Sequence, residues 1–465
     1  MHERWRSGQP MARSCVTLSP SPWTRGAPAI RINSTDDIFS SDFKAQSYWW
    51  ERSPRPDLPT RALPASVDVL VVGSGYTGLC AALQVARGGR STLVLDAEDA
   101  GWGCSSRNGG QISTSIKPNY YALARKHGPK TAFNIVKEGN NSLAWIKAFI
   151  AAEAIECDFL VPGRFHAAHN PREFETLAKD IANQPEGLEV PAHVVPRAEQ
   201  RRTLGTDSYH GGVVMEAHAS LDPGRYHQGL LERVLETGAA VVPHCPVTAL
   251  DKTSGGFTVV TSQGVVQARD VIVATNGYTG SLTPWLRRRV IPIGSYIIAT
   301  EPLAPYVMDR LFPSQKVISD TRKVVYYYRP SPDRTRILFG GRVTSGETDS
   351  LRSGAMLRRD LIHIFPELAE IKISHSWMGF VAYTFDELPH IGNHDGLHYA
   401  MGYCGSGVAM AGYLGTRVGQ QVLGLAEGRT GLEGAGFQTR SFYTGTPWFL
   451  PASIAYYRWR DGAGA

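Results

Sequence analysis

Hydrophobic residues first form a regular pattern just after a proline-rich lead. Residues 53–64 read SPRPDLPTRALP, and proline neither continues a helix nor donates a hydrogen bond in a central strand. Apolar runs at 69–72 and 92–95 then flank a stretch at 77–86 whose apolar positions follow helical spacing. Short β-branched runs indicate buried strands and 3.6-residue spacing indicates a helix, so the pattern predicts a βαβ unit.

The turn between the first strand and the helix carries a glycine motif. Gly73, Gly75 and Gly78 have the spacing G-x-G-x-x-G, and Asp96 ends the second strand. In this context the glycines allow a tight turn, close approach of a pyrophosphate and close helix–sheet packing, while the acid can hold ribose hydroxyls. The unit predicts an adenine dinucleotide site and leaves NAD and FAD both open.

Helical and strand patterns alternate further along the chain. Residues 119–155 are expected to be helical with a break at Gly128 and Pro129, and residues 290–375 read mainly as strands with one helix. Residues 396–425 read as a strand, a glycine loop and an apolar helix. Nothing repeats at a fixed period, which argues against a solenoid.

Composition narrows the class of protein. A chain of 465 residues exceeds one ordinary core and predicts two domains. The net charge of +6 comes without a dense basic stripe bearing aromatics, so no nucleic-acid partner is expected. The six cysteines form no C-x-x-C pair, so no metal site or disulfide framework is indicated and a cytoplasmic location is expected. No apolar run has the length of a membrane span.

Three glycine-bearing loops, each after an apolar strand, lie at Gly73, Gly277 and Gly405. Further motifs occur in order: SYWW (47–50), GWGCSSRNGGQ (101–111), ATNGYT (274–279), IPIGSYIIATEPL (291–303), WMGFVAYTFDELPHIG (377–392) and GYCGSGVA (402–409). Through these motifs, residues 45–430 resemble the D-amino-acid-oxidase-like flavoproteins, which include glycine oxidase and sarcosine oxidase. The resemblance is strongest to members acting on gamma-glutamylated polyamines.

The resemblance implies an α/β fold built around FAD. A discontinuous doubly wound, Rossmann-like FAD-binding domain is expected to hold an inserted α+β substrate domain on a mainly antiparallel sheet. The FAD-binding segments are expected at 46–158, 219–285 and 377–465, the last with a C-terminal tail. The substrate segments are expected at 159–218 and 286–376, and residues 1–45 are expected to be a disordered extension.

The resemblance also places the cofactor contacts. The 101–111 segment is expected to pass beside the pyrophosphate and the flavin ring, where backbone amides are wanted and side chains would clash. The residues expected to bind FAD are Gly73, Gly75, Gly78, Asp96, Ser105, Ser106, Arg107, Asn108, Gly109, Gly110, Gln111, Val247, Asn276, Gly277, Gly405, Ser406, Gly407 and Val408. Val381 stands where sarcosine oxidase carries its flavin-linking cysteine, so FAD is expected to be non-covalent, with Cys104 and Cys404 left open as attachment points.

Flavin amine oxidation needs no compulsory catalytic base, because the cofactor carries the hydride chemistry. Aromatic walls are therefore the expected signature of the substrate pocket. Tyr383, Trp377 and Tyr296 are predicted to line it, with Arg342 near the flavin or a substrate carboxylate. Each aromatic ring could equally be core packing.

The sequence leads to three functional hypotheses. The first is an FAD-dependent oxidase of a small amine of the gamma-glutamylputrescine type, giving an imine that hydrolyses to an aldehyde and ammonia, with molecular oxygen reduced to hydrogen peroxide. The second is an amino-acid or N-methyl-amine dehydrogenase that passes electrons to a quinone or carrier. The third is a flavin-binding subunit without turnover. The sequence does not indicate an oligomeric state.

Overall fold

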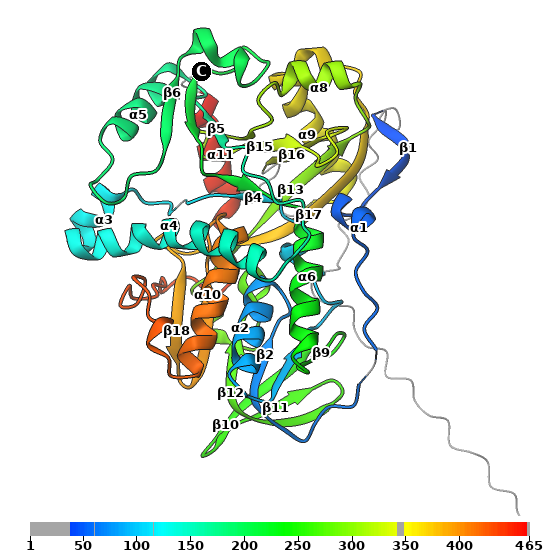
Figure 1. The fold of residues 1–465 in the computed structure, drawn as a ribbon, viewed down its shortest axis with the longest axis vertical. Coiled ribbons are helices and arrows are strands. Elements are labelled where there is room, and N and C mark those ends of the chain that lie inside the picture. Colours follow the sequence, from blue (N-terminus) through cyan, green and yellow to red (C-terminus); the bar gives the residue numbers. More distant parts are fainter. Residues whose placement is uncertain (1–37, 60, 115, 342–347, 463–465) are drawn as a thin grey trace, which may run out of the picture. The chain divides into compact units, whose positions relative to one another are not determined.

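The computed structural model describes residues 38–59, 61–114, 116–341 and 348–462. Within these residues two large sheets carry the fold (Figure 1). The first, eight-stranded sheet has the order β10-β11-β12-β2-β3-β9, with β19 paired to β12 and β18 paired to β19. Its strands are β2 (Ser66–Val72), β3 (Thr92–Leu95), β9 (Ala240–Val242), β10 (Val247–Thr253), β11 (Gly256–Thr261), β12 (Gly264–Val273), β18 (His390–His394) and β19 (Leu397–Met401).

The predicted βαβ unit is confirmed. β2 pairs in parallel with β3, and α2 (Tyr76–Arg87) connects them. The four residues of β3 are all buried, as are the last four residues of β2. A parallel strand covered on both faces needs such a continuous apolar run, which is why the pattern could be read from the sequence.

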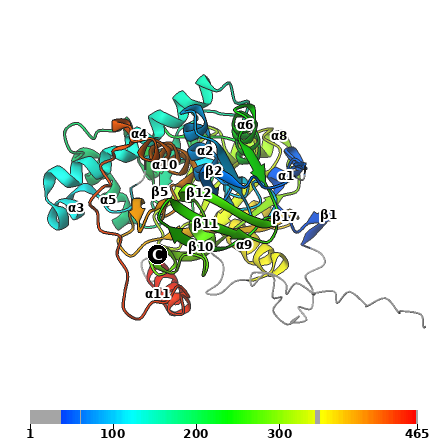
Figure 2. The same cartoon turned by 90° about the horizontal axis from the view of Figure 1, so that it is seen from below.

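Strand β12 joins segments that are far apart in the chain. Its first half pairs antiparallel with β11, while its second half lies parallel to β2 on one side and to β19 on the other. Figure 2 shows β10, β11 and β12 beside one another. The sheet is therefore assembled from early, middle and late parts of the chain, as the predicted discontinuous domain requires.

Two helices from opposite ends of the chain pack on this sheet. α10 (Gly407–Val422) lies beside α2 (Figure 1). A Cβ at Gly415 would lie only 2.4 Å from the Thr77 carbonyl oxygen of α2, so glycine is what permits this approach. Three further helices follow in this part of the fold: α3 (Tyr120–His127), α4 (Pro129–Ala152) and α6 (Pro223–Glu236). Gly128 and Pro129 separate α3 from α4, as expected.

The second sheet has nine strands in the order β1-β17-β13-β16-β15-β14-β5-β7-β6 and is mainly antiparallel, as predicted. Its strands are β1 (Phe39–Lys44), β5 (Arg164–Ala167), β6 (Ala192–Val195), β7 (Gly212–Met215), β13 (Ile291–Thr300), β14 (Val317–Asp320), β15 (Tyr327–Pro330), β16 (Ile337–Gly341) and β17 (Ile373–Tyr383). A short pair, β4 (Gln111–Ile112) and β8 (Ala219–Ser220), lies outside both sheets.

The two faces of the nine-stranded sheet differ. One face packs Phe165, Ile298, Tyr328 and Phe339 with α9 (Ser350–Ile364) in a large apolar cluster. The opposite face carries a smaller cluster of Tyr48, Trp49, Ile297, Leu338 and Trp377. We call the latter the loop face, because the glycine-rich 101–111 segment contacts it. The remaining helices are α1 (Tyr48–Arg52), α5 (Pro171–Ala182), α7 (Pro284–Arg287), α8 (Pro305–Leu311) and α11 (Leu450–Gly462).

Two expectations about the domain limits need correction. Part of the expected N-terminal extension is ordered, because β1 pairs with β17 and the rings of Phe39 and Phe43, 4.4 Å apart, pack on the apolar cluster. The expected boundary at residue 376 is also wrong, since it cuts β17, which runs unbroken to Tyr383. In the described part of the chain, no helix combines the length and apolarity of a membrane span.

Candidate functional site

The first glycine loop has the close contacts that its motif predicts. Gly73 has φ +104°, and a Cβ at Gly78 would lie 1.8 Å from the Gly73 carbonyl oxygen. A Cβ at Gly75 would lie 2.9 Å from the Ser105 hydroxyl, which accepts a 3.0 Å hydrogen bond from the Tyr76 amide. The glycine turn and the 101–111 segment are thus held close together at the start of α2. The N-terminus of a helix favours a phosphate group.

Asp96 directly follows β3 and holds the first loop. Its carboxylate accepts hydrogen bonds from the Ser74 amide at 2.7 Å and the Ser74 hydroxyl at 2.6 Å, and from the Glu98 amide at 3.1 Å. Burial raises the pKa of Asp96, and the hydrogen bonds from Ser74 oppose that rise. The Cys245 amide donates to the Asp96 carbonyl at 2.7 Å, which brings Val247 at the start of β10 near this acid.

Three consecutive carbonyls of the 101–111 segment are held by side chains from outside it. The donors are the Ser47 hydroxyl, the Trp377 indole and the Trp49 indole, which bond the carbonyls of Ser106, Arg107 and Asn108 at 3.1, 2.8 and 2.8 Å. The Trp50 indole adds a 2.7 Å hydrogen bond to the Ser106 hydroxyl. The N-terminal motif SYWW therefore holds this segment in place.

This support fixes the direction of the neighbouring amides. In a planar peptide the N–H points opposite to the carbonyl of the preceding residue. The amides of Asn108 and Gly109 therefore point away from the two tryptophans, and they have no acceptor among the residues that the structure describes. Asn108 and Gly109 are partly exposed, so these two amides are available to a ligand with acceptor atoms.

Arg107 lies between aromatic rings, and no carboxylate of the described residues forms an ion pair with it. Its guanidinium carbon is 4.6 Å from the Trp50 ring centroid and 4.1 Å from that of Trp102. Nη1 donates to the Met378 carbonyl at 3.2 Å, whereas the buried Nε has no hydrogen-bond partner within the described ranges. Burial lowers the pKa of Arg107. A partly buried cation whose charge no described carboxylate compensates fits the diphosphate of FAD.

The other two predicted loops meet each other. Asn276, which has φ +43°, accepts a 2.9 Å hydrogen bond from the Gly402 amide. A Cβ at Gly277 would lie 3.0 Å from the Phe380 carbonyl oxygen. Gly405 has φ +95° and precedes α10, whose N-cap is Ser406 and whose first residues are Gly407 and Val408. The start of α10 thus offers helix-end amides beside the Asn276 loop.

The predicted aromatic residues separate into three environments. Trp377 is only 3% exposed and supports the 101–111 segment instead of lining an open wall. Tyr296 pairs with Met378 and packs in the large apolar cluster, so its ring lies on the face opposite to Trp377. The prediction that Tyr296 lines the same pocket is therefore wrong. Tyr383 is partly exposed; strand alternation places it on the same face of β17 as Trp377, where it packs against Ile291, Ile293 and Tyr443. Arg342 lies outside the described residues.

Tyr383 has neighbours that the sequence did not reveal. A Cβ at Gly405 would lie 3.8 Å from the Tyr383 hydroxyl and 3.9 Å from the Lys117 amine. Tyr327, also on the loop face, would lie 3.0 Å from a Cβ at Gly109, and its hydroxyl is 2.7 Å from the Ser295 hydroxyl. Strand alternation could have placed Tyr327 on this face, but no local motif marks Lys117.

The two cysteines left open as attachment points are poor nucleophiles here. Burial raises the pKa of Cys104 to about 11 and that of Cys404 to about 12. The Cys404 sulfur lies 3.6 Å from the Thr384 hydroxyl. Because the thiolate is the reactive form of cysteine, both side chains behave as buried thiols.

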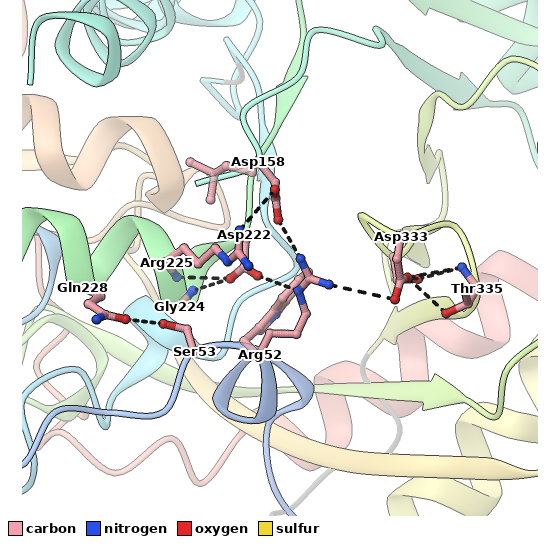
Figure 3. Close-up of polar contacts among 12 residues, drawn as sticks. Arg52, Ser53, Asp158, Asp222, Gly224, Arg225, Gln228, Asp333 and Thr335 are labelled. Atoms are coloured by element: carbon pink, nitrogen blue, oxygen red, sulfur yellow. Dashed lines mark hydrogen bonds and ion pairs between the residues drawn. The ribbon is translucent and has the colours of Figure 1, made fainter. Parts of the chain in front are cut away.

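An ion-pair network holds α1 against the rest of the site (Figure 3). Arg52 contacts Asp158 at 2.7 Å, Asp222 at 3.0 Å and Asp333 at 3.9 Å. The Asp222 carboxylate also accepts from the Gly224 amide at 2.9 Å, which caps α6. Asp333 belongs to the turn between β15 and β16, so α1 is fixed both to the start of α6 and to the nine-stranded sheet.

The residues present fit an FAD cofactor in their donor chemistry: a glycine loop at a helix start, an arginine with an unbonded Nε, and two amides without an acceptor among the described residues. Comparison with known proteins agrees. The model of the family described as FAD dependent oxidoreductase matches residues 68–421, and the chain belongs to this family. Its members bind FAD, and this protein is an FAD-dependent oxidoreductase.

Individual relatives are similar over most of the chain. Gamma-glutamylputrescine oxidoreductase from Escherichia coli K12 is 31% identical over 365 residues, covering 77% of this chain and 84% of that protein. Probable oxidoreductase OrdL from Haemophilus influenzae is 29% identical over 411 residues, covering 85% of this chain and 92% of that protein. The crystal structure of glycine oxidase from Geobacillus kaustophilus shares the fold, with a TM-score of 0.68 at 19% identity, covering 81% and 99% of the two chains.

Proposed function

We propose that this protein oxidises a small amine of the gamma-glutamylputrescine type, with molecular oxygen as the final electron acceptor. The observation that carries the proposal is the similarity to gamma-glutamylputrescine oxidoreductase, at 31% identity over 77% of the chain. In the reaction the amine loses two electrons and two protons to become an imine. Water then converts the imine to an aldehyde and ammonia, and oxygen is reduced to hydrogen peroxide.

Bound FAD supplies the two-electron acceptor for this chemistry. The chain's own residues must hold it and shape the space beside it. Arg107 offers its charge to the diphosphate, while the amides of Asn108 and Gly109 offer donors to acceptor atoms. Ser47, Trp49 and Trp377 hold these amides in one orientation. Preorganised donors of this kind need no rearrangement when the cofactor binds.

The substrate side of the site is aromatic. The partly exposed rings of Tyr383 and Tyr327 lie on the loop face, one beside the Gly405 loop and the other against Gly109. Aromatic walls exclude water and pack against the alkyl chain of an amine, which positions its carbon without a charged partner. We assign Tyr383 and Tyr327 this positioning role. The high pKa of the cysteines in the site supports non-covalent FAD.

Anaerobic titration of the purified holoprotein tests the proposal. Gamma-glutamylputrescine, sarcosine, glycine and D-amino acids are added in turn while the flavin absorbance is followed. We expect gamma-glutamylputrescine to bleach the flavin band, and air to restore it with one hydrogen peroxide per aldehyde. Absence of bleaching by gamma-glutamylputrescine overturns the substrate, and recovery only with a quinone overturns oxygen as the acceptor.

A pair of tyrosine variants tests the aromatic wall. Tyr383→Leu removes a ring from the loop face, and Tyr296→Leu is the matched control because its ring lies on the opposite face. We expect Tyr383→Leu to slow anaerobic flavin reduction by gamma-glutamylputrescine about tenfold or more, since poorer positioning of the reacting carbon lowers the rate. Tyr296→Leu is expected to lower thermal stability and leave the reduction rate of the folded protein nearly unchanged.

A further inference from the structure

A second polar group lies on the loop face, on strand β5. Phe165 and Ala167 of this strand enter the large apolar cluster, so the alternating residues Arg164 and His166 point to the loop face. Strand register extends this row: His166 is opposite Ser319 of β14, which is opposite Tyr327 of β15. The His166 ring and the Ser319 hydroxyl are 2.9 Å apart. Arg164 and His166 therefore share a face with the aromatic wall.

Arg164 gives this group a positive charge that no acidic residue in the described part of the chain compensates. The buried Nε of Arg164 has no hydrogen-bond partner, and Arg164 forms no ion pair with any residue that the structure describes. The neighbouring His218 is buried, its Nδ1 has no partner in the same ranges, and its Nε2 lies 3.1 Å from the Thr114 hydroxyl. Burial lowers the pKa of Arg164 to about 10 and that of His166 to about 3.

The side chains of described residues that shift the pKa values of this group's histidines are basic. Arg164 lowers the pKa of both histidines, and Lys117 further lowers the pKa of His166. Within the described ranges, no acidic side chain contributes to the pKa of Arg164, His166 or His218. Buried cations in proteins are normally paired with an anion. An anion would supply the partner that Arg164 lacks among the described residues.

Arg164 and His166 lie at a distance from the 101–111 segment that a substrate molecule could span. Gln111 donates to the carbonyls of Ile318 and Tyr328, each at 3.2 Å, so the end of the 101–111 segment lies on β14 and β15. β5 lies two strands away from β15, which is about 10 Å at the usual strand spacing. A ligand reaching from the aromatic wall to Arg164 must therefore be extended, with its anionic end several bonds from its amine.

We propose that Arg164 binds a carboxylate at the end of the substrate that is remote from the reacting amine, with His166 beside it. This inference rests on the proposed function and adds to it the residue that distinguishes a gamma-glutamylated amine from the free diamine. The guanidinium fork pairs with both oxygens of a carboxylate. Lys117 lies between this group and the Gly405 loop and adds positive charge along the path.

Steady-state kinetics of the holoprotein test the inference. Arg164→Gln removes the charge, Arg164→Lys keeps it, and the exposed Arg201→Gln is the matched control in the same half of the molecule. We expect Arg164→Gln to raise KM for gamma-glutamylputrescine about 10- to 100-fold, since losing a hydrogen bond to a charged group has this effect. The kcat is expected to stay within about twofold. KM for putrescine, which has no carboxylate, should not change, and Arg164→Lys should recover part of the affinity.

Calorimetric binding of glutarate to the same proteins gives a readout that needs no turnover. We expect glutarate to bind the wild type and Arg201→Gln equally and Arg164→Gln at least about tenfold more weakly. If wild type oxidises no amine but this pattern holds, the proposed function fails and the carboxylate site stands. If gamma-glutamylputrescine is oxidised with an unchanged KM and glutarate binding is equal in all variants, the carboxylate site is overturned and the proposed function stands.

If Arg164→Gln does not retain flavin, Ser319→Asp gives the same test with Arg164 in place. The new carboxylate would lie against the neutral His166, on the same sheet face as Arg164, and compete with the ligand for the positive charge of Arg164. Weaker glutarate binding supports the carboxylate site, and unchanged binding overturns it.

Discussion

Arg52 and Arg107 are both largely removed from solvent, yet their surroundings differ. Arg52 contacts three carboxylates, and the hydrogen bond and charge of Asp222 raise its pKa against the opposing effect of burial. Arg107 lies between two indole rings, contacts one carbonyl, and has its pKa lowered by burial. A fully compensated cation fixes protein segments to one another. An uncompensated cation keeps its charge for a ligand.

The largest expected effect is the loss of stability when the ion pairs of Arg52 are removed. Arg52→Met leaves Asp222 buried without its charge partner. We expect the free energy of unfolding to fall by about 3 kcal/mol, measured by urea denaturation, because a buried charge loses its partner. Exposed Arg201→Met, whose ion pair with Asp207 is fully solvated, should show no measurable change. Equal stability of Arg52→Met and wild type would contradict the assignment.

Arg107→Met tests the uncompensated region. We expect the Kd for FAD, measured by fluorescence titration of the apoprotein, to rise about 10- to 100-fold because a charged hydrogen-bonding partner of the diphosphate is lost. The stability of the apoprotein should not fall, since a desolvated cation is removed. The comparison fails if Arg107→Met loses stability without losing FAD affinity, or if Arg52→Met shows the larger loss of FAD affinity.

Trp49 connects the surroundings of Arg52 with the segment that carries Arg107. It lies on α1 beside Arg52, and its indole bonds the Asn108 carbonyl. Trp49→Phe keeps a ring but removes the donor to the Asn108 carbonyl. We expect a loss of about 1.5 kcal/mol in holoprotein stability, since a largely buried acceptor is left unpaired. The flavin absorption maximum should also shift as the 101–111 segment relaxes. Tyr48→Phe, which keeps the ring and its packing, is the control, and identical spectra for Trp49→Phe and wild type would contradict the supporting role.

The smallest expected effect concerns a neutral neighbour of the first loop. The His227 ring nitrogen lies 2.8 Å from the Ser74 carbonyl oxygen, and burial lowers the pKa of His227 to about 4. The unfolded chain takes up a proton near pH 6.5, whereas the folded protein does not. The contribution of His227 to the free energy of unfolding is therefore fully present above pH 6.5 and is lost as the pH falls towards 4.

This linkage predicts a loss of about 1 kcal/mol from His227 between pH 6.5 and 5.5. His227→Gln retains a donor to Ser74 and should remove that part of the pH dependence. Urea denaturation at the two pH values measures the difference. A pH slope that is the same in the variant and wild type would show that His227 does not contribute.

The first loop and βαβ unit could be predicted because their contacts are local in sequence. Gly73, Gly78 and Asp96 lie within one supersecondary unit, whose apolar pattern fixes its geometry. The hydrogen bonds that support the 101–111 segment could not be predicted from the sequence. The Ser47 and Trp49 donors are 59 residues from their acceptors, and the Trp377 donor is 270 residues from its acceptor. The motif SYWW was visible, but its role depends on tertiary contacts.

The error at Tyr296 has a similar physical reason. β13 is apolar on both faces, since Ile297 enters one cluster and Ile298 the other. A strand buried on both sides has no polar alternation to show which face meets the site. For Arg164 the sequence pattern is informative, because polar Arg164 alternates with apolar Phe165 and so indicates which face Arg164 occupies. The lack of an acidic partner among the described residues could not be predicted, because it depends on tertiary contacts.

The packing of α10 on α2 has a consequence for biosynthesis. The glycine motif emerges from the ribosome early, but the strand β19 and the helix α10 that complete its sheet come from residues 397–422. Segments synthesised first usually fold first, yet here the early βαβ unit must wait for most of the chain to be translated. Loading of FAD should therefore be a late event, and nascent chains ending before Gly407 should emerge unable to retain flavin.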